Sequence, residues 1–436
     1  MCVPAICNQR NTDWGADSLT YTLYLRWQLT RYPAARTIMT SLAGTASLYT
    51  ASDGRWSDGP EWDAIADIRE YQVTGSAIAL QKAEAAFALV DSTDAARFAL
   101  GACPGIDYQR AYGAAGKVKT LETDSNYVKA ALLLYQVTGD KTYLTKAEQK
   151  YQAIRKYFLN AGPPLYTAHV IDSGGSCDQV RGLFFASVNG NMIWDGATLA
   201  SLTGTARYLT QAVATAQAAG RILSDSSGAF TDLQTEADLV EPLVEGMYLL
   251  ASSDHEAFAR AWLLSAASAA AAERTPNGSY GRFFNGPPQP GPVTAWAANG
   301  GIALMIAAAK LDPRGVPADP WYWRGAVFVP DNRVLPAGPR GAVRFSLTGT
   351  AVAITGTLGV PGSKSGHARI LIDGQPMVNQ VGIWQGKFSG KGVLASQMLF
   401  AWRWPGPGAH RITITAAPGK PPDSTYFQMT GYYVVR

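Results

Sequence analysis

Apolar residues recur at helical spacing in repeated blocks along the first 310 residues of the chain. In the block 61–73 they fall on one side of a helix, and Gly75 stands where a helix C-terminus favours a left-handed residue. The ending Tyr-Gln-Val-Thr-Gly of this block returns at 135–139, and Leu-Thr-Gly returns at 202–204. This period of 64 to 65 residues, with two amphipathic stretches in each copy, predicts stacked helical hairpins.

Weaker copies extend the series in both directions and predict six first helices, of which five have an obvious second helix. The first helices are expected at 17–29, 61–73, 123–137, 190–202, 239–251 and 296–310. Six hairpins in series predict an (α/α)6 barrel with the first helices inside. An open solenoid is the alternative, but solenoids keep a more uniform period than these linkers allow. Long, variable loops before the inner helices predict a site on one face.

The pattern changes after Lys310, where prolines mark a linker and β-type alternation replaces helical spacing. Strands are expected at 343–347, 368–372, 411–415 and 432–435, with a hairpin turn at Asp373-Gly374. Short strands with Gly and Pro turns are typical of a β-sandwich. We therefore predict a multi-domain α and β chain: a barrel domain over residues 1–312 and a jelly-roll-like β-sandwich accessory domain over residues 313–436.

The composition excludes several classes of function. The net charge is +4 with no cluster of Lys and Arg, which argues against nucleic-acid binding. No apolar run reaches about 18 residues, so no membrane span is expected. The sequence has no serine-hydrolase elbow, zinc-protease motif, complete P-loop or dinucleotide fingerprint. Its four His residues are scattered, so we expect no metal site and no cofactor, and we expect a monomer.

Four cysteines allow two disulfides, and the expected pairs are Cys2–Cys7 and Cys103–Cys177. Four reduced cysteines in a cytosolic protein are the alternative. Met1 stands directly before a cysteine, with no apolar segment after it. This start fits a mature exported protein that was given a start Met, so a secreted or extracytoplasmic location is expected.

Acidic and amide side chains gather at the starts of the predicted inner helices. Asp58 and Glu122 both lie 16 residues before the Thr that ends their helix, and Asp124 and Asn189 both lie 14 before it. Equivalent positions in successive hairpins place such groups on one rim of the barrel. Paired carboxylates cleave glycosidic bonds as general acid and as base or nucleophile, and Trp faces stack on sugar rings. The rim therefore predicts polysaccharide cleavage.

The candidate residues fall into two groups. The catalytic candidates are Asp58, Glu122, Asp124 and Glu241, and the substrate-binding candidates are Asp17, Trp56, Glu61, Asn189, Asn191, Glu245 and Trp296. For each acidic residue, helix capping and the helix dipole offer a purely structural alternative. Asp58 is singled out because Gly-Pro follows it and two Trp residues flank it, which fits a catalytic acid in a water-poor setting.

The run Tyr135–Asp140, followed by Tyr143, Leu144 and Ala147, resembles the helix ends of the endo-α-1,6-mannanases of glycoside hydrolase family 76. The resemblance covers about residues 15–310. It implies an (α/α)6 barrel and an endo-acting hydrolase of an α-linked polysaccharide such as α-mannan. The family's catalytic motif is an Asp-Asp pair that opens the second inner helix.

Counting back from Thr74-Gly75, the first aspartate of that pair falls on Asp58 and the second on Gly59. The second carboxylate must then come from elsewhere on the rim, and Glu61, Glu122, Asp124 and Glu241 are the candidates. The run 366–374 resembles accessory sandwich modules of secreted glycosidases. Its domain offers Trp384, Trp402 and Trp404 as glycan platforms, or alternatively as packing residues.

Two other classes of function stay open on the sequence. A polysaccharide lyase on the same barrel needs a Tyr or His base, and Tyr108, Tyr112, Tyr127 and His169 are available. The ultraviolet absorbance of an unsaturated product separates a lyase from a hydrolase. A non-catalytic glycan-binding or cell-surface protein is the third class, and the missing second aspartate is the observation that favours it.

Overall fold

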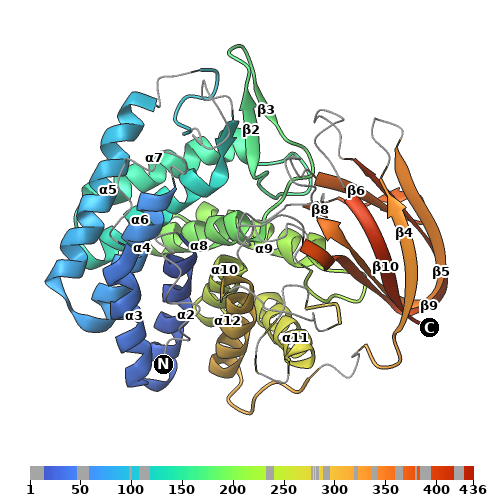
Figure 1. Cartoon of the computed structure of the whole chain (residues 1–436). Helices are drawn as coiled ribbons and strands as arrows, with labels where there is room; N and C mark the ends of the chain where they lie inside the picture. Colours follow the sequence, from blue (N-terminus) through green and yellow to red (C-terminus); the bar gives the residue numbers. More distant parts are fainter. Residues whose placement is uncertain are drawn as a thin grey trace. The chain divides into compact units, whose positions relative to one another are not determined.

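A computed structural model provides the structure of the chain (Figure 1). The residues it describes are 14–46, 58–97, 101–107, 118–231, 240–275, 278, 280, 284–287, 295–318, 323–335, 341–358, 367–378, 381–382, 394–416 and 427–436. Helices and three short strands occupy the described ranges up to Leu311, and strands alone follow, as the change of pattern after Lys310 predicts.

The predicted first helices are present, with ends that move by a few residues. They are α2 (Trp14–Thr30), α4 (Gly59–Thr74), α6 (Leu121–Thr138), α8 (Ala186–Thr203), α10 (Glu241–Ser252) and α12 (Ala295–Leu311). The glycines after α4, α6 and α8 have φ of 71°, 75° and 70°, and each donates its N–H to a carbonyl four residues earlier. The repeated Thr-Gly is therefore a repeated helix cap.

The second helices are α3 (Pro33–Ala46), α5 (Ala77–Arg97), α7 (Lys141–Phe158), α9 (Ala206–Ile222) and α11 (Ala257–Glu273). Neighbouring first helices pack against each other from α2 to α10, and α10 also contacts α2. Ile306 of α12 packs with Tyr21 and Leu25 of α2, and Lys310 of α12 donates to Gln28 of α2. Because the contacts return to the first helix, the helices form a barrel and not an open solenoid.

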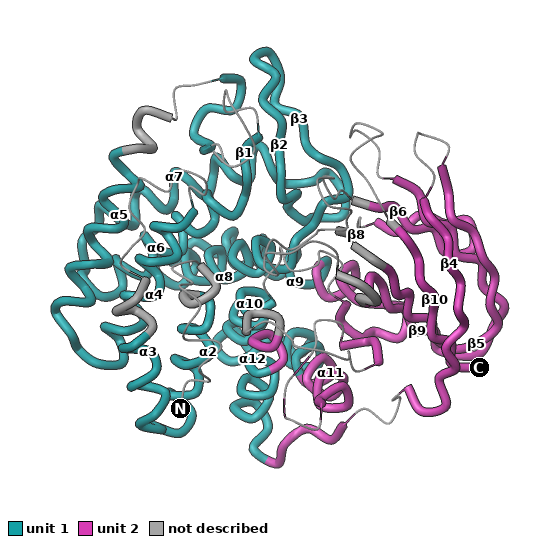
Figure 2. Tube along the Cα trace, viewed as in Figure 1, with its two compact units in different colours: residues 1–218, 240–263, 302–313 teal, residues 219–239, 264–301, 314–436 magenta. Residues whose placement is uncertain are grey.

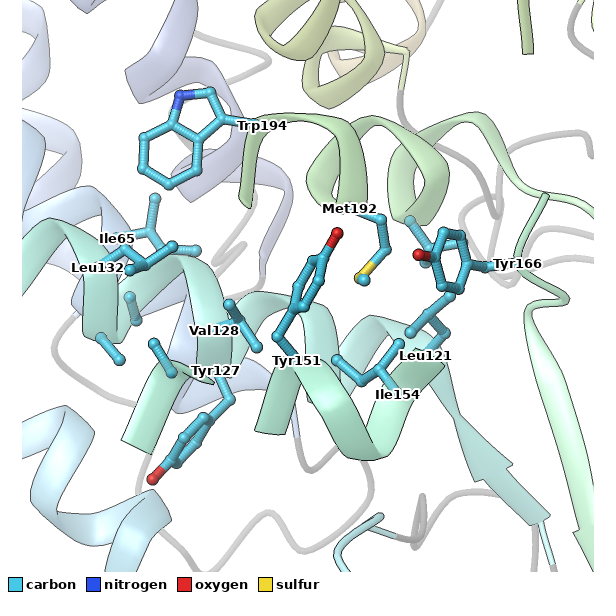
Figure 3. Close-up of a cluster of buried hydrophobic side chains, with 14 of the residues drawn as sticks. Ile65, Leu121, Tyr127, Val128, Leu132, Tyr151, Ile154, Tyr166, Met192 and Trp194 are labelled. Carbon is cyan, nitrogen blue, oxygen red and sulfur yellow. The ribbon is translucent and has the colours of Figure 1, made fainter. Parts of the chain in front are cut away.

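A large buried cluster lies between the inner helices α6 and α8 and the outer helix α7. Figure 3 shows Tyr151 of α7 lying between Val128 of α6 and Met192 of α8. Its hydroxyl reaches Gly196, where an added Cβ would lie 2.8 Å from the oxygen. Contacts this close fix how near the outer helix α7 stands to α8.

Helices α8 and α10 cross with their backbones in contact. A Cβ at Gly190 would lie 2.2 Å from the backbone nitrogen of Leu243, and a Cβ at Gly246 would lie 2.6 Å from the carbonyl oxygen of Gly190. Separations below 3.0 Å are not found for real Cβ atoms, so both positions require glycine. The crossing fixes the first turns of α8 and α10 beside each other.

A small antiparallel sheet stands where α6 and α8 begin. Its strands are β1 (Val118–Thr120), β2 (His169–Asp172) and β3 (Cys177–Gln179), in the order β1-β2-β3. Cys177 of β3 forms a disulfide with Cys103, which confirms that predicted pair. Cys2 and Cys7 lie outside the described residues.

The later strands form one antiparallel sheet. They are β4 (Val327–Val334), β5 (Ala342–Leu358), β6 (His367–Ile372), β7 (Gln375–Pro376), β8 (Val381–Gly382), β9 (Leu394–Ala416) and β10 (Phe427–Val435). The order is β4-β10-β5-β9-β6-β7, with β8 paired to β6. Asp373 and Gly374 have φ of 53° and 81°, so the predicted hairpin turn is confirmed.

In the described ranges these strands belong to one hydrogen-bonded sheet, where a sandwich was expected to have two. Register shifts after Gly349 and Ile354 interrupt the pairing of β5 with β9, and bulges of this kind bend a strand. Phe345 and Ile354, on either side of the first shift, enter the same buried cluster. Both sides of the bend thus contribute to one buried cluster, a second cluster forms around Trp323, Ala353 and Met398, and the sandwich arrangement stays a prediction.

Contacts divide the chain into two compact units, which Figure 2 colours separately. One contains residues 1–218, 240–263 and 302–313. The other contains residues 219–239 and 264–301 together with residues 314–436. The second unit thus joins two segments from the helical region to the strands, whereas the sequence divided the chain once, at 312/313. Separately folding domains stay a prediction.

Asp225 explains this grouping. Its buried carboxylate accepts hydrogen bonds from Ser227, Ala229, Asn285 and the backbone N–H of Arg403 in β9. Desolvation raises the pKa of Asp225, and the Ser227 hydroxyl, Arg403 and Asn285 oppose that rise. One carboxylate therefore ties both helical-region segments of the second unit to its sheet.

The tryptophans proposed as glycan platforms are placed as follows. Trp404 is buried in the β core, with its ring stacked 3.8 Å from that of His410. Trp402 donates its indole N–H to the Ser226 hydroxyl and stacks on Phe400. Both therefore pack within their own unit. Trp384 lies outside the described residues.

Candidate functional site

Charged and amide side chains from four inner helices meet inside the first unit. Arg69 of α4 and Lys129 of α6 both pair with Glu245 of α10. Lys129 also donates to Asn191 of α8 at 3.2 Å, and Asn191 donates to Asn126 of α6 at 2.8 Å. We call these five buried residues the central network. Because they bond across the barrel, they mark the inward side of each helix.

Asp58 lies on the inward side of α4. It is the N-cap residue, with φ −86° and ψ −8°, and its carbonyl accepts the N–H of Trp62. Arg69 follows Asp58 by eleven residues, which is about three helical turns, so their side chains project within about 20° of each other. Asp58 is 8 % exposed and makes no capping hydrogen bond with its side chain. The Asp58 side chain therefore lies on the same side of α4 as Arg69, about three turns toward the N-terminus.

Glu122 has the same position on α6. It precedes Lys129 by seven residues, or about two turns, so both side chains lie on the inward side. Glu122 is half-buried, in the first turn of a helix whose N-cap is Thr120. Helices α4 and α6 pack directly against each other. Asp58 and Glu122 therefore lie on the inward sides of neighbouring helices, each at the N-terminal end.

Asp124 faces the other way. It is fully buried, pairs with Lys150 of the outer helix α7 at 2.9 Å, and accepts the backbone N–H of Asp107 at 3.2 Å. Lys150 also pairs with the Asp107 carboxylate at 2.7 Å. Desolvation raises the pKa of Asp124 to about 7, against the opposing effect of Lys150. The outward position gives Asp124 a packing and ion-pairing function, so we no longer propose it as catalytic.

Glu241 and Glu245 stand one turn apart on α10. Glu245 is the acidic centre of the central network, so its predicted contact with substrate is replaced by ion pairs with Arg69 and Lys129. Glu241 is at the first position of the helix, on the same side as Glu245, and is 1 % exposed. Glu241 therefore also lies on the inward side of its helix, but its side chain is more buried than that of Glu122.

The two asparagines of α8 face different sides of their helix, as Glu122 and Asp124 of α6 do. Asn189 bonds the backbone N–H and carbonyl of Tyr166 and the carbonyl of Phe185, which holds the loop before α8. Asn191 points inward, into the central network. Asp195, one turn beyond Asn191, is fully buried, and desolvation raises its pKa well above the ordinary value. Asn189 is therefore a scaffold residue.

The remaining candidates are less accessible or lie outside the described side chains. Glu61 is fully buried in the first turn of α4. Asp17 and Trp296 fall in α2 and α12, but their side chains are not described, and Trp56 lies outside the described residues. Of the possible lyase bases, Tyr127 is buried and donates to Asp91 at 2.8 Å, away from the inward side. Tyr108 and Tyr112 lie outside the described residues.

Sequence reasoning missed Arg69 and Lys129. Both sit within helical stretches that otherwise read as core, and Lys129 lies 5.2 Å from the centre of the buried Trp194 ring. Two neighbouring hairpins each have a charged residue on an apolar helix face, and this pattern could have identified Arg69 and Lys129 in the sequence. Within the described ranges, no three His, Cys, Asp or Glu side chains gather as a metal ion requires. No helix there is long and apolar enough to cross a membrane.

No protein-family model matches the sequence, and no curated protein matches it. Solved structures do match. The family 76 α-1,6-mannanase of a Salegentibacter species is 20 % identical, with a TM-score of 0.59, and the match covers 69 % of this chain and 90 % of that one. The helical part of this chain has a glycoside hydrolase family 76-like fold.

Other solved structures extend the comparison. A family 76 α-mannanase from Bacteroides thetaiotaomicron is 18 % identical, with a TM-score of 0.55, over 69 % of this chain and 86 % of that one. Dfg5 from Chaetomium thermophilum, solved with glucosamine, is 14 % identical, with a TM-score of 0.54, over 72 % and 86 %. An inactive Salegentibacter mannanase, with two adjacent aspartates changed to asparagine, was solved with α-1,6-mannotriose.

Proposed function

We propose that this protein is a glycoside hydrolase that cleaves an α-linked mannan within the chain, with Asp58 and Glu122 as its catalytic pair. The observation that carries the proposal is their common placement: both stand at the N-terminal ends of neighbouring inner helices, on the sides that face the barrel interior. The family 76 fold supports mannan as the substrate. The match of Asp58 to the first aspartate of the family motif supports its role.

Glu122 replaces the second aspartate, which is Gly59 here. Glu122 is half-buried, whereas Glu61 and Glu241 are at most 1 % exposed. A carboxylate that must reach a substrate from solution needs the accessibility that Glu122 has. Asp58, which matches the first aspartate of the family motif, is the other carboxyl of the pair and takes the role of general acid. Glu122, at a helix N-terminus that favours an anion, suits the base or nucleophile.

The finer architecture belongs to the same proposal. We propose that the barrel is of the (α/α)6 type, that α12 lacks a second helix, and that the β domain is a sandwich built from one bent sheet. We further propose that the protein acts outside the cytoplasm, because its disulfide suits an oxidising compartment. A monomer suffices, since both proposed catalytic residues come from one unit of one chain.

The test is a panel of polysaccharides incubated with the purified protein. Reducing ends should appear with α-1,6-mannan and should be absent with polygalacturonate. Release of short oligosaccharides of several lengths at early times indicates cleavage within the chain. A polysaccharide lyase would instead give ultraviolet-absorbing products, and a non-catalytic glycan-binding protein would bind mannan without new reducing ends; either result contradicts the proposal.

A further inference from the structure

The small sheet β1-β2-β3 has two faces with different contacts. On one face, the Lys119 ammonium donates to the Ile106 carbonyl at 2.9 Å, and the Asp172 carboxylate accepts the Ala102 N–H at 3.0 Å. Cys177, which pairs with Asp172 across β2 and β3, forms its disulfide with Cys103 on the same face. Segment 101–107 therefore covers this face of the sheet.

His169 lies on the opposite face. Side chains alternate along a strand, and directly paired residues of antiparallel strands share a face. His169 pairs with Thr120, and their neighbours Val170 and Lys119 pair on the other side. The His169 side chain therefore projects away from segment 101–107, beside the N-cap residue of α6.

Glu122 projects to the same side as His169. Asp124 reaches segment 101–107, where it accepts the N–H of Asp107. Glu122 and Asp124 are two residues apart, so their side chains diverge by about 200° around the helix. Glu122 therefore points away from segment 101–107, as His169 does, and stands two residues after the partner of His169 in the sheet.

The imidazole is held in place from a second helix. The ring is 8 % exposed and meets the ring of Phe185 edge-on, with centroids 5.9 Å apart. Phe185 is the N-cap residue of α8. Its carbonyl is in turn held by the Asn189 amide. His169 is thus fixed between the first turns of α6 and α8, at the end of the barrel where the proposed catalytic pair lies.

Among the residues that the structure describes, few other charged groups face this imidazole. On its own face of the sheet, Asp178 is exposed and accepts the Ser176 hydroxyl, and Arg181, just after β3, is also exposed. The opposite face carries Lys119 and Asp172, with Asp107, Asp124 and Lys150 beyond them. The first turn of α8 has no charged residue, and α10 contributes Glu241 farther along the rim.

We propose that His169 is a positioning residue for Glu122, whose carboxylate its imidazole N–H holds ionised and correctly oriented. The proposal rests on the proposed function, in which Glu122 is the base or nucleophile. A donor to an ionised carboxylate stabilises the anion. Without the donor, Glu122 should hold its proton to higher pH, and the acid limb of the pH–rate profile should move upward.

The kinetic test uses two substitutions and a control. His169→Phe fills the same space without a donor, and it should lower kcat by about 10- to 100-fold with little change in KM and move the acid limb to higher pH. His169→Gln restores a side-chain N–H and should recover most of the rate and the original limb. His255→Gln, at an exposed site between α10 and α11, should change neither. Unaltered kcat and acid limb in His169→Phe would overturn the proposal.

A second test does not depend on activity. Titration of the imidazole by NMR in Glu122→Gln should give a midpoint for His169 lower by about 0.5 unit or more, because a neighbouring anion is lost. Asp178→Asn removes an exposed anion from the same face and should leave the midpoint in place. An unchanged midpoint in Glu122→Gln refutes the contact. A wild-type protein that cleaves no glycan refutes the proposed function, while this titration still decides whether the two residues interact.

Discussion

Glu122 and Asp124 stand two residues apart in the first turn of α6 and face opposite sides of the helix. Asp124 is bound to Lys150 of an outer helix, whereas Glu122 lies on the side that carries Lys129 into the barrel. Two acids that look equivalent in the sequence are thus separated into a scaffold residue and a catalytic candidate by about 200° of helical rotation.

Asp58→Asn should abolish mannan cleavage, with a loss of at least about a thousandfold in kcat, because an essential carboxyl becomes an amide. The melting temperature should stay within about 2 °C, since the Asp58 side chain makes no capping hydrogen bond that the substitution could remove. Initial rates and calorimetry measure the two effects. An active variant that melts several degrees lower would return Asp58 to a capping role.

Glu122→Gln should lose activity as completely as Asp58→Asn. Glu241→Gln and Asp124→Asn should each keep more than about a tenth of the rate, because neither carboxyl is accessible to substrate. Added azide or formate can replace a missing carboxylate in glycosidases, and rescue of Glu122→Ala by either anion would identify its role. If Glu241→Gln were inactive and Glu122→Gln remained active, Glu241 of α10 would be the second catalytic residue.

The buried Asp107–Lys150–Asp124 cluster should make stability fall as pH rises. The pKa of Asp124 is raised from 3.8 to about 7 by desolvation, so the folded state retains a proton that the unfolded chain releases. This stabilisation is complete below pH 3.8 and is lost between pH 3.8 and about 7. Urea unfolding at pH 5 and pH 8 should therefore show a smaller pH dependence for Asp124→Asn than for the wild type.

One outcome of the urea experiment would contradict this prediction. If the free energy of unfolding falls by the same amount in Asp124→Asn and in the wild type between pH 5 and pH 8, the Asp107–Lys150–Asp124 cluster is not the cause of the pH dependence. Asp67, whose pKa desolvation also raises to about 7, would then be the next group to replace. Asp67 lies on α4, away from Lys150, and Lys82 of α5 opposes the rise in its pKa, so Asp67→Asn tests this group separately.

The Cys103–Cys177 disulfide links residues 74 apart in the sequence. Closing a loop of this length stabilises a fold by about 4 kcal/mol in the chain-entropy description. The double substitution Cys103→Ala with Cys177→Ala should lower the free energy of unfolding by about that amount in urea titrations. Thiol titration of unfolded, unreduced protein should find neither cysteine free, and two reactive thiols at these positions would refute the pairing.

A chain that ends at residue 312 should fold less completely than its helix content predicts. It keeps residues 219–239 and 264–301 but lacks the strands with which they form one unit. Asp225 would lose its bond to Arg403, and Asn285 would lose those to Ala401 and Trp323. A broad thermal transition is expected by circular dichroism, and a sharp transition at the full-length temperature would show that the helical domain is independent.

The sequence predicted the helices well because their information is local. The Thr-Gly ends of α4, α6 and α8, the apolar spacing and the proline linker each act within a few residues. The candidate site was predicted less well because it depends on rotation and on distant partners. Asn189 and Glu245 looked accessible beside the rim, but one holds a loop and the other neutralises two cations from other helices.

Lys129 shows most clearly why the candidate site is hard to predict from the sequence. A lysine in the middle of an apolar helix is costly to bury alone, and its partner Glu245 is 116 residues away in the sequence. Neither residue suggests the other until the hairpins close into a barrel. The grouping of residues 219–239 with the β strands was hidden for the same reason, since Asp225 and Arg403 are 178 residues apart.

The crossing of α8 and α10 at Gly190 and Gly246 has a consequence for how such proteins diverge. A single added methyl group at either glycine would wedge the two helices apart and shift Glu241, Glu245 and Asn191 together. Two residues with no side chain and no chemistry therefore tolerate substitution poorly. Surveys that score only acids, amides and aromatics would pass over the pair on which the spacing of all three depends.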